Sequence, residues 1–86
     1  MPEISRFFGI VIAMYYADHG PPHFHAHYGS ATAQIGLSPV SVMDSDLPPG
    51  TLRLALEWAN LHERELLQNW QLVRSGNTPS RIAPLE

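Results

Sequence analysis

The chain has 86 residues, no cysteine and a formal net charge of −3 when its histidines are neutral. This length accommodates one domain, residues 1–86, and no second one, and the lack of cysteine excludes disulfides, thiol nucleophiles and zinc sites built on cysteine. All five basic residues are arginines, without the basic excess of general nucleic-acid binders, so the charge does not favour RNA as a partner.

We expect neither a secretion signal nor a membrane-spanning segment. Glu3 stands where a signal peptide would carry its basic region, and no small-residue cleavage site follows the apolar run at residues 7–16. That run has about half of the ~20 residues that a membrane-spanning helix needs. The sequence therefore predicts a soluble, cytoplasmic protein that does not contact a membrane.

The first half of the chain has the composition of β-strands. Residues 7–16 are β-branched, aromatic and apolar on both faces of an extended chain, which predicts one central strand. Gly20-Pro21-Pro22 then predicts a turn. Residues 23–28 alternate strictly, which predicts a strand with one face in the core and the other face lined by histidines. The core side carries Phe24, Ala26 and Tyr28, and the other side carries His23, His25 and His27.

Further strands follow in the same half. Gly29-Ser30 is a hairpin signal that leads into a strand at residues 31–37, and residues 40–43 predict a short strand after the next turn. Consecutive strands joined by such short turns pair antiparallel. We therefore expect an antiparallel meander of three to four strands within residues 6–43.

The second half predicts a helix. Acidic residues and prolines at 44–49 form a helix-entry signal, and residues 51–74 contain neither glycine nor proline. This pattern predicts one long helix at about residues 50–74, and Asn60-Leu61-His62 is the place where a break would come. An extended C-terminal tail at residues 77–86 should lie against the domain. The fold class is thus α+β, with the helix packed on the sheet.

One stripe of the predicted helix is apolar although it lies away from the expected core stripe. On a wheel of 100° per residue it consists of Leu54, Trp58, Leu61 and Leu72. Its first interpretation is a surface for a small cognate protein or a second copy of the chain, with the tryptophan as anchor. The alternative is that the helix is more deeply buried, for example under the C-terminal tail.

Chemistry is most strongly indicated in a histidine box at residues 18–28, which holds four of the five histidines. Imidazoles titrate near neutrality, so a pair of them can divide the acid and base roles of a proton transfer. A neighbouring carboxylate can orient an imidazole, and an arginine can hold an anionic substrate. On this interpretation the catalytic residues are His19, His23, His25, Asp18 and Arg6, and the reaction is phosphodiester transfer or hydrolysis.

Two other uses of the box remain open. A His-x-His pair on one strand, with a third histidine or an aspartate from the preceding turn, can also bind zinc or another divalent transition metal, and the first ligand set is His19, His23 and His25. The histidines can also be ordinary surface residues beside a turn that only sets hairpin geometry. We expect no cofactor as the first interpretation and a divalent transition metal as the second.

The chain also resembles a bacterial family known as domain of unknown function 4160. The resemblance covers the opening residues 1–10, the box 18–29 with its Pro-Pro-His-Phe-His-Ala core, and helix segments at 56–59 and 66–70. His27 falls where the family pattern is variable and often acidic. His19, His23 and His25 are therefore stronger candidates for the functional site than His27. The positions that match the family pattern are Arg6, Asp18, His19, His23, His25, Ala26 and Tyr28.

The resemblance implies a small prokaryotic protein often encoded beside another small protein, in pairs proposed as toxin–antitoxin modules with this family on the toxin side. It implies no catalytic residues. The first functional hypothesis is therefore a toxin-like component that acts through the histidine box on RNA or another phosphate-containing target, although an RNA-cleaving toxin is expected to be basic. The alternative is a non-enzymatic binding or regulatory module with a structural or metal-binding box. Whether the protein is an enzyme is open at this point.

Overall fold

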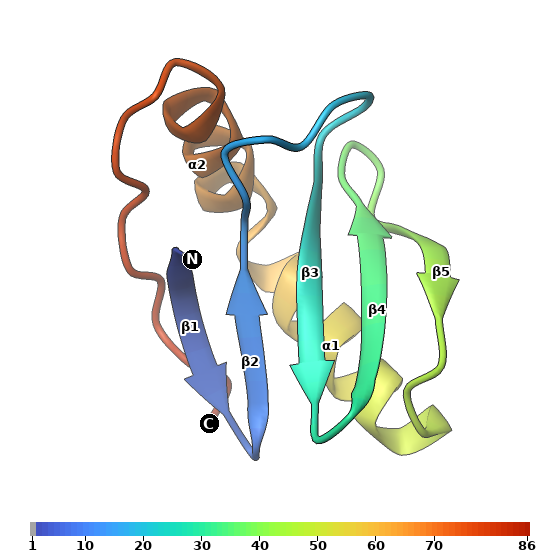
Figure 1. Ribbon diagram of the computed structural model, residues 1–86. Coiled ribbons are helices and arrows are strands. Elements are labelled where there is room, and N and C mark those ends of the chain that lie inside the picture. The colour runs from blue at the N-terminus through green and yellow to red at the C-terminus, as the bar shows by residue number, and fades with distance from the viewer. Residues whose placement is uncertain (1) are drawn as a thin grey trace.

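A computed structural model describes residues 2–86 and shows an α+β fold, with a sheet followed by helices in the chain (Figure 1). Met1, the first residue of the opening motif, lies outside the described residues. Five antiparallel strands follow one another across the sheet in chain order. They are β1 (Glu3–Phe7), β2 (Ile10–Ala13), β3 (His23–Tyr28), β4 (Ala31–Gly36) and β5 (Ser41–Ser45). Two helices follow: α1 (Pro49–Leu61) lies behind the sheet in the view of Figure 1, and α2 (Glu63–Arg74) lies at the upper left, behind the connection between β2 and β3.

The apolar run at residues 7–16 is not one strand, which corrects the expected strand count from three or four to five. Phe8 and Gly9 both have positive φ, 48° and 79°, and form a two-residue hairpin turn between β1 and β2. Positive φ at both central residues suits such a hairpin because it matches the twist of the flanking strands. Phenylalanine is not a typical turn residue, so the composition of residues 7–16 gave no indication of a hairpin.

Strand β3 lies at the centre of the sheet and has the predicted alternation. Phe24 and Ala26 are fully buried against the helices, as expected from their face of the strand. Tyr28, expected on the same buried face, is instead 40% exposed at the end of the strand. Its ring lies over Gly9, where a Cβ would approach the ring to 3.3 Å.

The predicted long helix is divided in two at His62, within the segment where a break was expected. His62 has φ −121° and ψ 24°, outside the helical range, and its backbone N–H donates to the carbonyls of Trp58 and Ala59. The residues before and after the break therefore do not share one helical projection. This invalidates the single wheel from which the extra apolar stripe was derived.

The C-terminal tail covers α1 and the edge strand β1. The Trp58 indole N–H donates to the Ala83 carbonyl at 2.8 Å, and the Ile82 N–H donates to the Ile4 carbonyl at 2.8 Å. Trp58 is fully buried and contacts the rings of Phe7 and Phe24. The expected surface anchor is thus a core residue, because the tail occupies the side of the helix that the wheel left uncovered.

The rest of that stripe is only partly exposed. Leu61 is 67% exposed at the end of α1, whereas Leu54 and Leu72 are half-buried. Within residues 2–86, neither helix combines the length and the apolar character of a bilayer-crossing segment.

Candidate functional site

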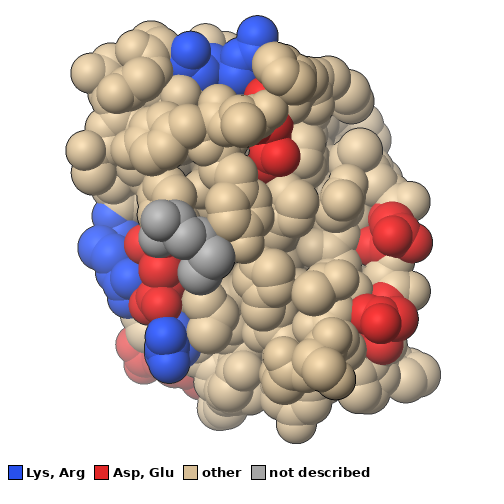
Figure 2. Space-filling model, in the orientation of Figure 1, with Lys and Arg blue, Asp and Glu red and all other residues tan. Residues whose placement is uncertain are grey.

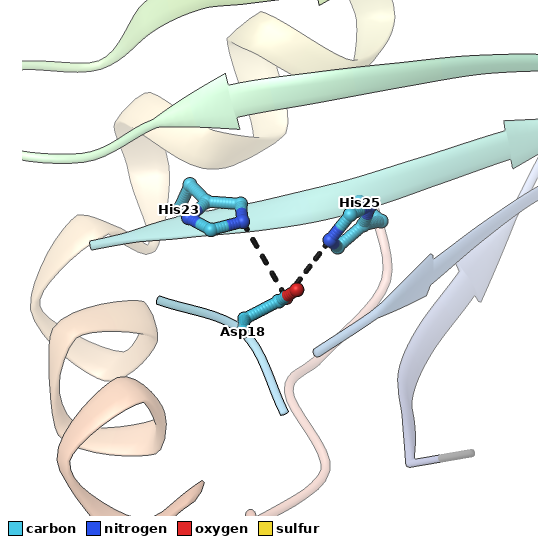
Figure 3. A group of neighbouring side chains, drawn as sticks. All are labelled: Asp18, His23 and His25. Carbon is cyan, nitrogen blue, oxygen red and sulfur yellow. Dashed lines mark hydrogen bonds and ion pairs between the residues drawn. The ribbon is translucent and has the colours of Figure 1, made fainter. Parts of the chain in front are cut away.

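The candidate site lies at the start of β3, where the connection from β2 folds back over the strand (Figure 3). His23 and His25 project from the face of β3 opposite to Phe24, because successive side chains of a strand alternate. The connection brings Asp18 to the same place, as its backbone N–H donates to the Tyr15 carbonyl in a turn. Figure 3 shows the three side chains converging, with the carboxylate between the two imidazoles.

The carboxylate of Asp18 contacts both imidazoles through one oxygen. His25 Nε2 donates to Asp18 Oδ2 at 2.9 Å, which is an ordinary charge-assisted hydrogen bond. His23 Nε2 lies 3.4 Å from the same oxygen, longer than a well-formed hydrogen bond. The side chains of His25 and Asp18 are 15% and 20% exposed, so solvent and small ligands reach this part of the cluster.

His23 is held firmly in the protein interior. It is 4% exposed, its ring centroid lies 5.1 Å from that of Trp70 on α2, and its Nδ1 lies 3.0 Å from the Pro21 carbonyl oxygen. A carbonyl oxygen only accepts hydrogen bonds, so Nδ1 of His23 carries the proton and donates it. The turn that the two prolines form therefore fixes the orientation and the tautomer of this imidazole.

Two residues extend the cluster along the strand. The Tyr15 ring meets His25 edge-on at 4.6 Å, and its hydroxyl is hydrogen-bonded to His27 Nε2 at 2.7 Å. Burial, with a smaller contribution from the charge of Asp18, raises the pKa of Tyr15. Burial and the neighbouring His25 lower the pKa of His27. Both shifts favour the neutral forms, so this pair is an uncharged hydrogen-bonded contact beside the cluster.

Two predicted site residues lie elsewhere. Arg6 is on β1, in register with Val11, and its guanidinium pairs with Glu3 at 2.7 Å. His19 is exposed, whereas its neighbour Asp18 is partly buried in the cluster. In the metal-ligand set proposed from sequence, the structure thus places Asp18 where His19 was expected. Of the five predicted catalytic residues it brings together Asp18, His23 and His25.

Sequence reasoning missed Tyr15, Trp70 and Arg74. Trp70 packs on His23, and the Arg74 guanidinium lies 5.8 Å from its ring centroid. A surface hollow of about 480 Å³ next to this stack is lined by Trp70, Gln71, Arg74 and Ser75. The sequence does not show that Trp70 lies next to His23, because the two residues are far apart in the chain and meet only where α2 packs against β3.

The comparisons with known proteins agree with the resemblance noted in the sequence. No curated protein and no solved structure matches the chain. The model of one protein family, described as Domain of unknown function (DUF4160), matches residues 9–71, which is more than half of the chain. The matched region contains Asp18, His23 and His25. On this match, the chain belongs to the family Domain of unknown function (DUF4160).

Proposed function

We propose that the Asp18–His23–His25 cluster is the active site of a toxin-like protein, one component of a bacterial two-protein module that works in the cytoplasm. The observation that carries the proposal is the 2.9 Å hydrogen bond between Asp18 Oδ2 and a His25 imidazole that remains open to solvent. A carboxylate in this position orients the imidazole and stabilises its protonated form, which is what a general base needs.

The substrate in this proposal is a molecule that presents a phosphate group. His25 takes a proton from the attacking water or hydroxyl, and Asp18 stabilises the resulting imidazolium. Arg74, whose guanidinium lies 5.8 Å from the Trp70 ring centroid, is the arginine we propose as a second contact for an anionic substrate. It takes the role that the sequence analysis gave to Arg6.

Charge distribution does not favour a long nucleic acid as the substrate. In the view of Figure 2, the charged side chains of the described residues lie near the borders of the face, and the middle of the face is uncharged. A protein that tracks a nucleic-acid backbone has a basic stripe instead. The net charge of −3 points the same way.

A second function is favoured by the burial of His23. A non-enzymatic binding module would use the box structurally, and a histidine that is 4% exposed, stacked on Trp70 and bonded to Pro21 fits that role. The partly exposed His25 and Asp18 fit it less well. The two functions are therefore best separated by substitutions at His25 and Asp18, which have solvent access, and not at His23.

The partner in this proposal is a small cognate protein encoded nearby, or else a second copy of the chain. Of the predicted contact residues, Leu61 is exposed and Trp58 is not. We therefore expect Leu61→Ala to weaken a partner complex without unfolding the protein. Such a result would assign the junction of α1 and α2 to the interface.

Growth of a bacterial host tests the proposed function. Wild type, Asp18→Asn and His25→Gln would each be induced with and without the neighbouring gene, and His19→Ala serves as the matched control because that exposed histidine lies outside the cluster. Soluble protein is measured in every culture. We expect growth arrest by wild type and His19→Ala, relief by the neighbouring gene, and no arrest by the two cluster variants. Normal growth with abundant folded wild type would contradict the proposal.

A further inference from the structure

We propose that Asp18, His23 and His25 bind one divalent transition-metal ion of the zinc type and leave at least one coordination position open. One ligand atom from each residue lies within 4.8 Å of the other two. Figure 3 shows these atoms facing a common point between β3 and the preceding loop. Among residues 2–86, this is the one such group of histidine and acidic side chains.

The separations fit the size of a metal site. Ligand atoms at about 2.0–2.1 Å from a tetrahedral zinc ion lie about 3.3 Å from one another. Asp18 Oδ2 is 2.9 Å from His25 Nε2 and 3.4 Å from His23 Nε2, so two of the three separations are already within about 0.4 Å of this value. The third, between the two imidazoles, is at most 4.8 Å.

The contact between His23 and the Pro21 carbonyl also supports the proposal by its geometry. Because the His23 Nδ1–H donates to the Pro21 carbonyl, the neutral ring presents an unprotonated Nε2 to the Asp18 carboxylate. Histidines that bind metals have this same arrangement, with the second ring nitrogen donating to a backbone carbonyl or a carboxylate.

The ligand types select the class of metal. Two imidazole nitrogens and one carboxylate oxygen suit zinc, cobalt, nickel or iron(II), whereas calcium and magnesium prefer all-oxygen sites. Sites with three protein ligands generally keep a water or a substrate in the remaining position. The solvent access of Asp18 and His25 leaves room for such a ligand. The site is therefore of the open type and not a closed structural type.

This inference goes beyond the proposed function and does not depend on it. A bound metal would take the place of the proton on His25 Nε2, and metal-bound water would then replace His25 as the base. The growth experiment does not distinguish these two bases. Metal binding is measured on the purified chain, so it can succeed or fail whatever the growth experiment shows.

Cobalt(II) titration of the purified, tag-free, metal-free protein tests the proposal. We expect one ion per chain, visible d–d absorption typical of coordination by nitrogen and oxygen, and displacement of cobalt by zinc. Asp18→Asn and His25→Gln should each lower the affinity at least about 100-fold, since a lost ligand costs more than a lost outer-shell contact. His19→Ala, an exposed histidine of the same box, should bind like wild type.

Circular dichroism of each metal-free variant shows whether it is folded. Wild type that is folded but takes up no cobalt at micromolar protein would overturn the proposal. Equal loss in His19→Ala and in His25→Gln would also overturn it, because binding would then belong to surface histidines. If His25→Gln does not fold, Asp18→Asn decides, since asparagine has nearly the shape of aspartate and is a weak metal ligand.

Discussion

Replacing Trp58 by phenylalanine tests how the C-terminal tail is held. The change removes the indole N–H that donates to the Ala83 carbonyl at 2.8 Å, a contribution of about 1 kcal/mol. It also empties about 40 Å³ in a fully buried site, which at ~24 cal/mol per Å³ costs about 1 kcal/mol more. The expected destabilisation of about 2 kcal/mol lowers the Tm by about 8–16 °C in a domain of this size.

Thermal unfolding followed by circular dichroism measures this effect. Leu61→Ala is the matched control, because Leu61 is on the same helix but 67% exposed, and its loss should change the stability by no more than about 0.5 kcal/mol. A Tm for Trp58→Phe within about 2 °C of wild type would refute the reasoning. At ~4–8 °C per kcal/mol, such a shift means a loss of stability too small for a buried, hydrogen-bonded tryptophan. Equal effects of the two variants would also refute it.

Three further substitutions test other parts of the fold. Asn69→Ala removes both hydrogen bonds between that side chain and the Ser80 backbone and should cost about 2 kcal/mol in urea unfolding; an unchanged midpoint would contradict the docked tail. Phe8→Asn should raise the Tm by stabilising the positive-φ position by about 0.5–1 kcal/mol, and a lower Tm would argue against the hairpin. Contacts with Arg6 and Arg81 lower the pKa of Glu3 from 4.5 to about 2, so this carboxylate adds stability above pH 4.5 that is lost as the pH falls toward 2. Glu3→Gln should therefore flatten the pH dependence in that window, and an identical acid unfolding curve would count against the contacts.

The part of the fold predicted correctly from sequence rests on strong local periodicity. The alternation in residues 23–28 gave β3 and its buried Phe24 and Ala26, because a strand with one buried face has only one compatible register. The prediction of one strand at residues 7–16 was wrong because this run is apolar throughout, although it contains the Phe8-Gly9 hairpin turn. A turn made by an aromatic residue before a single glycine has no compositional signature, and only strand pairing reveals it.

In the helical half the helix span was predicted correctly, but the first interpretation of the apolar stripe as a surface was wrong at Trp58. Projecting about 24 residues onto one wheel assumes an unbroken helix, whereas the chain leaves the helical range at His62. The wheel also contains no information about segments that arrive later in the chain. The tail at residues 77–86 lacks regular secondary structure, yet it supplies the partner for Trp58. Trp58, the expected anchor of the stripe, is therefore covered from within the chain, as in the alternative of burial under the tail.

The candidate site depends partly on local periodicity and partly on contacts between distant segments, so only some of its residues could be predicted from the sequence. His23 and His25 could be paired from sequence because a fixed two-residue period places them on one face of a strand. Asp18 and His19 are equally close to them in the sequence, and only the backbone turn decides which one points inward. Arg74 and Trp70 reach the cluster through tertiary packing alone. Because Asp18 contacts His25 from the loop and Trp70 packs on His23 from α2, substitutions in either segment should alter the site without changing the histidines themselves.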